Sequence, residues 1–288
     1  MNDNVSFIGT GNMGGALIRA ACRVHDPKLV HITNRSMDKA RSLADELGCS
    51  LAASNRDAVL AGEYIFLCVK PQMMGELLSE IAPVLKSCLD RGEKKILVSI
   101  AAGLKILYFK EQLAMCGDAL KVVRVMPNTP SAIGKGMLAV CAGPEVESEY
   151  ISGVCGILSD AGRVECLGEN LMDQFSVVGG CAPAFVYMFI EALADGGVKI
   201  GLPRAQAMTY AAQTVLGAAA MVLESGQHPG VLKDAVCSPG GSTIVGVAQL
   251  EKQGFRSAAI EAVCAGYEKT VFTVEGSGST FGSFFIIL

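Results

Sequence analysis

The N-terminal part of the sequence alternates short β-branched runs with helical patterns, and this alternation strongly limits how the chain can fold. The runs that predict strands are residues 5–8, 29–33, 64–69, 95–100, 121–126 and 137–141. Helical patterns lie between them, at residues 13–22, 37–47, 73–85, 105–115 and 146–158. Strands that alternate with helices in this way form a parallel sheet with helices on both faces.

Strand patterns end at about Val164, and long apolar helical patterns follow at residues 182–199, 204–225, 242–253 and 255–274. Helices that are apolar on most faces are buried. A helical region of this size has little interior, so we expect subunits to associate through it. The alternative is a single bundle that buries these helices within one chain. We therefore predict two domains, residues 1–164 with an α/β fold and residues 165–288 with an all-α fold.

Composition excludes several classes of protein. The chain has 288 residues, of which 51% are hydrophobic and 18% charged, so it has enough apolar residues for a large core. A net charge of −4 leaves no basic surplus for a nucleic-acid backbone. We see no secretory signal before the first strand and no uninterrupted apolar run long enough to span a membrane. We expect no nucleic-acid or membrane partner.

The cysteines predict a reducing compartment. There are 11 of them, an odd number, and none forms a CxxC pair. Most lie in apolar stretches such as Phe66-Leu67-Cys68-Val69, which favours reduced, buried thiols in a cytoplasmic protein. The 3 histidines show no ligand spacing, so we expect no metal site. We assign no role to the C-terminal tail, residues 276–288.

A glycine-rich loop follows the first strand and opens the first helix. It has the pattern GxGxxG and consists of Gly9, Thr10, Gly11, Asn12, Met13 and Gly14. The first glycine permits a tight turn, the second lets the backbone approach a pyrophosphate, and the third lets the helix pack on the strand. The helix N-terminus offers free N–H groups to the phosphates. The loop predicts a nicotinamide dinucleotide site in a Rossmann-type, doubly wound sheet.

The end of the second strand favours NADPH. Sites for NAD usually have a carboxylate there, whereas this chain has Asn34, Arg35 and Ser36. Arg35 can bind a 2′-phosphate with its planar donors, and its neighbours can add hydrogen bonds. The alternative is that Arg35 is a solvated cation that stacks on adenine, so use of NADH stays open.

Two further strand ends carry candidate cofactor contacts. Val69, Lys70 and Pro71 follow the strand at residues 64–69, at the edge where such sheets bind ligands. Ala101 and Ala102 follow the next strand, and their small side chains let the nicotinamide ring approach the backbone. Lys70 can equally be a surface lysine at a strand end, and the two alanines can be part of an ordinary turn.

A proline–glycine–glycine turn, Ser238–Thr243, precedes one of the late helices. Its backbone N–H groups could form a nest for a carboxylate, with Gly241 or Ser242 as the N-cap and the Thr243 hydroxyl beside the bound acid. The other interpretation is a plain helix start with good capping chemistry. Local physical arguments alone leave these two interpretations open.

Several segments together resemble pyrroline-5-carboxylate reductases, over about residues 5–273. They are Phe7–Gly14, Val69–Gln72, Arg124–Pro130, Ala192–Val198, Gly226–Gly230 and Ser238–Thr243. The resemblance implies an oxidoreductase that uses NADPH, or NADH, to reduce 1-pyrroline-5-carboxylate to L-proline, the last step of proline biosynthesis. It also implies a helical domain that forms an intertwined homodimer, with further assembly to an oligomer such as a decamer.

The resemblance also implies site residues. The family's substrate carboxylate would lie against Gly240, Gly241, Ser242 and Thr243, with Thr243 as the catalytic residue that hydrogen-bonds the ring nitrogen. Glu169 falls near the family's substrate-pocket acid. Asn34, Ser36 and Asn55 match its contacts to the adenosine phosphate.

Two departures from the family pattern, one in a short segment and one at a single residue, bear on substrate preference. Gly180–Phe185 reads Gly-Cys-Ala-Pro-Ala-Phe where relatives usually have Gly-Ser-Gly-Pro-Ala-Tyr, and Gly226 stands where many relatives have an acid. One alternative is a β-hydroxyacid dehydrogenase, whose chemistry needs a general base, typically a lysine in the helical domain after a glycine-rich turn. Here the helix after Gly179 has no lysine until Lys199. The other is a non-catalytic NADPH sensor, which has no need of the Ser238–Thr243 turn.

Overall fold

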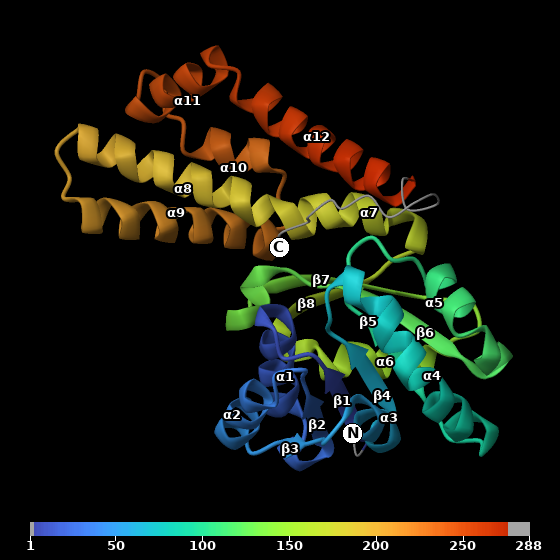
Figure 1. The fold of residues 1–288 in the computed structure, drawn as a ribbon. Coiled ribbons are helices and arrows are strands. Elements are labelled where there is room, and N and C mark those ends of the chain that lie inside the picture. The colour runs from blue at the N-terminus through green and yellow to red at the C-terminus, as the bar shows by residue number, and fades with distance from the viewer. Residues whose placement is uncertain (1–2, 276–288) are drawn as a thin grey trace. The chain divides into compact units, whose positions relative to one another are not determined.

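The structure is a computed structural model that describes residues 3–275, with the side chains described up to residue 271. The C-terminal tail, residues 276–288, lies outside this description. By its contacts the chain divides into two compact units. The sheet unit contains the β-sheet, extends to Cys181 and includes the last helix from Tyr267 on. The helical unit covers Ala182–Gly266. Figure 1 shows the elements of each unit.

The sheet unit contains an eight-stranded sheet in the order β3-β2-β1-β4-β5-β6-β7-β8. The strands are β1 Val5–Ile8, β2 Val30–Thr33, β3 Ser50–Leu51, β4 Tyr64–Leu67, β5 Ile96–Ser99, β6 Lys121–Met126, β7 Gly136–Ala142 and β8 Gly162–Cys166. The predicted parallel doubly wound sheet is confirmed, except that β6 and β7 are antiparallel. These two strands are joined by a short 3-10 turn, Thr129–Ile133, and not by the long crossover that a parallel pair requires.

Helices cover both faces of this sheet (Figure 1). They are α1 Asn12–Val24, α2 Met37–Leu47, α3 Asn55–Ala61, α4 Met74–Asp90, α5 Ile106–Gln112, α6 Ser148–Ile157 and α7 Met172–Phe175. Alternation along β1 separates two cores, because successive side chains of a strand point to opposite faces. Phe7 packs with residues of α1 and α6, whereas Ile8 packs with residues of α3, α4 and α5.

The structure also differs from the sequence-based boundaries. Strand β3, helix α3 and strand β8 were not expected, and α4 continues through Pro83 to Asp90. The predicted domain boundary after residue 164 falls inside β8, which pairs with β7, whereas the division by contacts follows Cys181. Which residues separate as independent folding domains stays a prediction.

The helical unit is built on small side chains. It contains α8 Ala182–Lys199, α9 Arg204–Ser225, α10 Pro229–Ala235 and α11 Ser242–Lys252, and α12 Phe255–Glu275 begins in it. Helices α8 and α9 approach closely: a Cβ atom on Gly197 would lie 3.2 Å from the Cβ atom of Ala207. Ala194, Ala207 and Ala211 form the small buried cluster between these helices.

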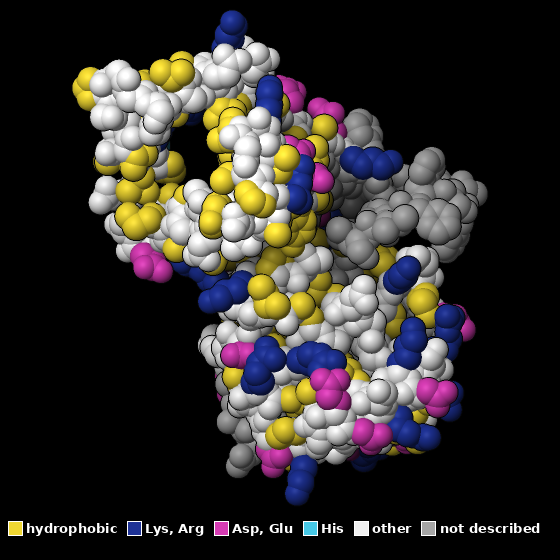
Figure 2. Space-filling view, turned by 90° about the vertical axis from the view of Figure 1, so that its left-hand side faces the viewer, with side chains coloured by type: hydrophobic (Ala, Val, Ile, Leu, Met, Phe, Trp, Pro, Cys, Tyr) yellow, Lys and Arg dark blue, Asp and Glu magenta, His cyan; other side chains and the backbone are white. Residues whose placement is uncertain are grey.

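Large apolar side chains remain exposed on the helical unit. Figure 2 shows apolar patches over these helices. The exposed residues of α8 and α9 include Tyr187, Met188, Leu193, Tyr210, Leu216, Met221 and Leu223. Exposed apolar area of this extent marks an interaction surface. By length and composition, residues 169–199 also form a helical run apolar enough to cross a membrane, with 17% of its most apolar window buried.

Candidate functional site

The glycine loop leaves no room for side chains at two of its glycines. Gly9 has φ 112°, and a Cβ atom there would lie 2.6 Å from the carbonyl oxygen of Cys68. A Cβ atom on Gly14 would lie 2.3 Å from the carbonyl oxygen of Gly9. Both distances are shorter than any real Cβ contact, so the close packing of α1 on β1 and β4 requires glycine at both positions.

Gly11, by contrast, faces open space. No atom lies within 4 Å of the position that its Cβ would take. Gly11 is the N-cap of α1 and makes no side-chain capping bond, so the first N–H groups of the helix are available to a ligand. The hydroxyl of Thr10 is buried and has no hydrogen-bond partner among the described residues. These features fit a dinucleotide pyrophosphate at this helix N-terminus.

The end of β2 lies beside this loop. The N–H of Gly9 donates to the carbonyl oxygen of Thr33 (2.9 Å), and the N–H of Thr10 donates to Oδ1 of Asn34 (3.5 Å). Ser36 is the N-cap of α2, and its hydroxyl makes no capping bond. Arg35 is exposed. The structure therefore brings Asn34, Arg35 and Ser36 to the same edge as the glycine loop.

An open cleft of about 580 Å³ extends from the loop along α1 and α2. Its lining includes Asp38, Lys39 and Ser42 of α2, which sequence reasoning did not single out. Their position in the first turns of a helix after the second strand was a usable signal. Beneath the loop, burial raises the pKa of the Cys68 thiol, so this sulfur stays neutral and places no negative charge near bound phosphates.

The ends of β4 and β5 complete this edge of the sheet. The N–H of Cys68 donates to the carbonyl oxygen of Ile8 (2.8 Å), and the N–H of Ile100 donates to the carbonyl oxygen of Leu67 (3.3 Å). Lys70 is exposed after β4, and the N–H of Ala101 donates to the hydroxyl of Ser99 (3.2 Å). Residues 69–71 thus follow β4, the neighbour of β1 at the point where the strand order reverses, and residues 101–102 follow β5, the next strand along the same carboxyl edge.

Two predicted site residues already have protein partners. The side-chain amide of Asn55, at the start of α3, donates to Glu80 of α4 (2.8 Å). Oε1 of Glu169 accepts hydrogen bonds from the N–H of Ile106 (2.7 Å) and from Nη1 of Arg124 (2.8 Å). Sequence reasoning quoted the segment that contains Arg124 but gave that arginine no role.

The Ser238–Thr243 turn lies in the helical unit, immediately before α11. The N–H of Gly241 donates to the carbonyl oxygen of Ser238 (3.0 Å), and Gly240 has φ 67°. Proline followed by a glycine of positive φ is typical of a type II turn. Gly241 is the N-cap of α11 and makes no side-chain capping bond. Because its own N–H is used within the turn, the N–H groups available to an anion are those of Ser242 and Thr243, and Thr243 is exposed.

Two family models match the chain. Residues 4–103 match the model described as NADP oxidoreductase, coenzyme F420-dependent. Residues 169–272 match the model described as pyrroline-5-carboxylate reductase dimerisation. This second match accounts for the exposed apolar helices, because a second subunit covers such a surface in a dimer.

Known proteins match nearly the whole chain. The pyrroline-5-carboxylate reductase of Escherichia coli K12 is 41% identical, over 94% of this chain and 98% of its own length. That of Pisum sativum is 37% identical, over 92% and 94%. Among solved structures, the reductase from Coxiella burnetii has a TM-score of 0.86 at 29% identity, covering 94% of this chain and 98% of its own.

A solved structure with a bound dinucleotide also matches. It is the pyrroline carboxylate reductase of Plasmodium falciparum with NADP bound, with a TM-score of 0.79 at 33% identity and coverage of 95% and 98%. The glycine loop, the Ser238–Thr243 turn, the dimerisation model and these full-length relatives agree: the chain belongs to the pyrroline-5-carboxylate reductase family.

Proposed function

We propose that this protein reduces 1-pyrroline-5-carboxylate to L-proline with NADPH, the last step of proline biosynthesis. The observation that carries the proposal is the open backbone at Gly11, at the N-terminus of α1 beside Asn34 and Ser36. Relatives that are named for this reaction, one of them with NADP bound, support it.

The reaction requires two transfers. When bound, NADPH would supply the hydride for the carbon of the C=N bond, and the ring nitrogen would take up a proton, which gives the secondary amine of proline. Because a protonated imine is already electrophilic, the protein mainly has to position the reactants. It binds the 2′-phosphate with Arg35 and Ser36 and the pyrophosphate with the N–H groups of Gly11 to Met13.

The Ser238–Thr243 turn binds the substrate. The N–H groups of Ser242 and Thr243, at the positive end of α11, bind the substrate carboxylate. The hydroxyl of Thr243 hydrogen-bonds the ring nitrogen and passes it a proton. Gly240 and Gly241 give the turn its shape, because a Cβ atom on Gly241 would lie 2.4 Å from the hydroxyl oxygen of Ser238.

The protein acts as a homodimer in the cytoplasm and assembles further, to an oligomer such as a decamer. The exposed apolar side chains of α8 and α9 support the formation of the homodimer. Light scattering coupled to size-exclusion chromatography should give a mass of ten chains, and a mass of two chains would restrict the assembly to the dimer.

A direct assay tests the proposed reaction. Purified protein is mixed with NADPH or NADH and the cyclic imine, and loss of the reduced cofactor is followed together with formation of L-proline. We expect both, with a preference for NADPH. A β-hydroxyacid with NADP⁺ serves as the control substrate, and turnover of that acid without proline formation would contradict the proposal.

A further inference from the structure

The carboxylate of Glu169 caps a helix that lies far from it in sequence. The N–H of Ile106, the first residue of α5, donates to Oε1 of Glu169 at 2.7 Å across a separation of 63 residues. Lys105, the N-cap residue of α5, makes no side-chain capping bond. Glu169 therefore provides the acceptor that an N-cap side chain normally provides.

The same oxygen holds a buried cation. Nη1 of Arg124 donates to Oε1 of Glu169 at 2.8 Å, and the Arg124 side chain is 5% exposed whereas that of Glu169 is 31% exposed. A buried guanidinium without its carboxylate is strongly unfavourable. Separating the pair would leave the charge of Arg124 buried and unpaired, so the ion pair is maintained. Because Arg124 belongs to β6, this strand fixes the position of the Glu169 carboxylate.

These contacts hold both ends of one loop. The loop, residues 101–105, joins β5 to α5 at the carboxyl edge of the sheet. At its start, the N–H of Ala101 donates to the hydroxyl of Ser99 (3.2 Å), and Ser99 pairs in register with Arg124. At its end, Ile106 donates to Glu169, which Arg124 binds. Arg124 thus lies beside both attachment points.

We propose that Glu169 and Arg124 are positioning residues that fix the 101–105 loop for hydride transfer, and that Glu169 does not bind the substrate. The inference rests on the proposed function and on the expectation from the sequence that the nicotinamide ring approaches the backbone at Ala101 and Ala102. It replaces the substrate-pocket role that family resemblance implies for Glu169. Glu169 is also the first residue of the matched dimerisation region, so this contact joins that region to the cofactor loop.

The predicted effect is on the rate of the chemical step. Displacing a reacting group by about 1 Å can lower the rate about 100-fold without a change in substrate contacts. We therefore expect Glu169→Ala to lower kcat at least about 10-fold and to change the KM for the cyclic imine less than about 3-fold. The matched control is Glu165→Ala, which removes the exposed Arg163–Glu165 ion pair four residues earlier and should leave kcat unchanged.

Two conservative variants separate positioning from substrate binding. In Glu169→Gln the amide oxygen still accepts both hydrogen bonds, so kcat of the folded enzyme should stay within about 3-fold of the wild type, although the loss of the counter-charge of Arg124 lowers its denaturation midpoint. Glu169→Asp keeps the charge but shortens the side chain, so it should lose more kcat than the glutamine variant. A carboxylate that binds the substrate through its charge predicts the reverse order, together with a raised KM, and that result would overturn the inference.

A measurement that does not depend on activity completes the test. Amide hydrogen exchange at residues 101–106 should be at least about 10-fold faster in Glu169→Ala than in Glu165→Ala, because the N–H of Ile106 loses its acceptor. Unchanged exchange would overturn the inference even if the assay of the wild type succeeds. If the wild type does not reduce the imine while exchange accelerates as expected, the proposed function fails and the contact of Glu169 with the loop stands.

Discussion

Nδ2 of Asn128 donates a hydrogen bond of 2.7 Å to the carbonyl oxygen of Gly179, and its Oδ1 accepts one of 3.0 Å from the N–H of Met137. Gly179 belongs to the π-helical turn Ser176–Cys181, which immediately precedes α8. Such turns are rare and are often found at functional sites. Because Asn128 is 7% exposed, its amide fixes the π-helical turn against the start of β7.

Replacing Asn128 should therefore destabilise the protein. Asn128→Ala removes both bonds and leaves the buried carbonyl group of Gly179 and the N–H of the half-buried Met137 without partners, at a cost of about 2–4 kcal/mol. Asn128→Asp still accepts from Met137 but turns a carboxylate oxygen toward the carbonyl oxygen of Gly179, so it should be at least as unstable. Thermal denaturation at one fixed protein concentration measures both. A midpoint equal to that of the wild type in either variant would contradict this reading of the turn.

Thr243 carries the proposed chemistry, and its hydroxyl can be removed or kept. Thr243→Ala should lower kcat/KM about 10- to 100-fold, because the ring nitrogen loses its hydrogen-bond partner. Affinity for NADPH, measured by the fluorescence of the bound cofactor, should change less than about 2-fold, because Thr243 binds substrate and not cofactor. Thr243→Ser keeps the hydroxyl and should retain most activity. Full activity of the alanine variant would remove Thr243 from the reaction.

Arg35 should determine the preference for NADPH. Arg35→Ala removes the planar donors beside the 2′-phosphate, so the KM for NADPH should rise about 10-fold while that for NADH is unchanged. Arg35→Glu adds repulsion and should reverse the preference. Arg41→Ala, which removes another exposed arginine of α2, is the matched control. Equal increases of both KM values in Arg35→Ala would favour the alternative that Arg35 stacks on adenine.

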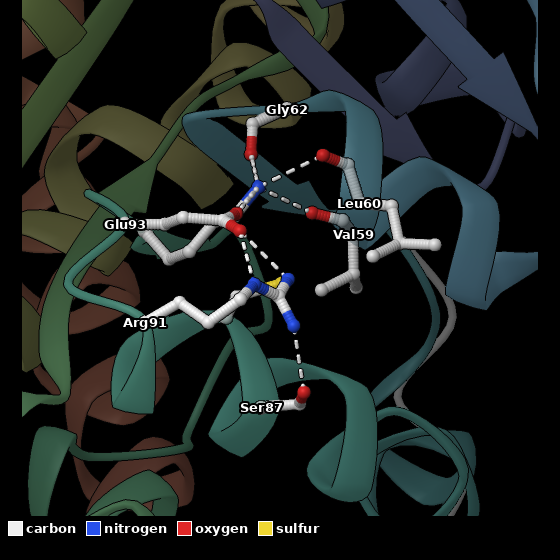
Figure 3. A network of polar contacts seen from close by, with 8 residues as sticks. Val59, Leu60, Gly62, Ser87, Arg91 and Glu93 are labelled. Carbon is white, nitrogen blue, oxygen red and sulfur yellow. Dashed lines mark hydrogen bonds and ion pairs between the residues drawn. The ribbon is translucent and has the colours of Figure 1, made fainter.

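Lys95 is a buried cation that caps a helix, and Figure 3 labels the residues whose carbonyl groups accept its hydrogen bonds, Val59, Leu60 and Gly62. Its ammonium group donates to the carbonyl oxygens of Val59, Leu60 and Gly62, each at 2.9 Å, and its side chain is 5% exposed. Glu93 lies 3.5 Å from it and also binds Arg91. A cation at the C-terminal end of a helix is favourable, and here it satisfies carbonyl groups at the end of α3.

Removal of this ammonium group should lower the stability of the folded protein and leave its preference for substrate and cofactor unchanged. Lys95→Met keeps the length of the side chain but leaves three carbonyl groups without their donor, at a cost of about 3 kcal/mol or more. Lys94→Met removes the adjacent exposed lysine and should change the denaturation midpoint little. Equal midpoints for the two variants would show that the α3 carbonyl groups find other donors.

The local signals of the sequence explain which elements could be predicted. Helix α2 was predicted with its observed bounds because its apolar spacing ends at Gly48, which takes the left-handed conformation with φ 71°. Helices α8 and α9 were also predicted with their observed bounds, since glycine and proline separate them. Strand β3 has two residues, and α10 has seven, so neither shows enough of a period to be recognised.

The same distinction between local signals and long-range contacts decides which parts of the candidate site could be predicted. The glycine loop could be predicted because each of its glycines has a local reason. The capping of α5 by Glu169 could not, because 63 residues separate the partners and nothing in the local pattern of either indicates the other. The antiparallel pairing of β7 was missed although the sequence held a signal for it: residues 127–136, between the two predicted strands, show no helical pattern and are too few for the crossover of a dozen or more residues that a parallel pair requires.

The contact of Gly9 with Cys68 has a consequence for how the dinucleotide is held. The N–H of Gly9 also donates to the carbonyl oxygen of Thr33 at the end of β2, and not even a Cβ atom fits between Gly9 and Cys68, so the start of the loop is held in place by its neighbours. The loop loses its conformational entropy when the chain folds, so binding of the cofactor costs little further conformational entropy. We therefore expect the dinucleotide to bind to this preformed loop rapidly, without a slow conformational closing step.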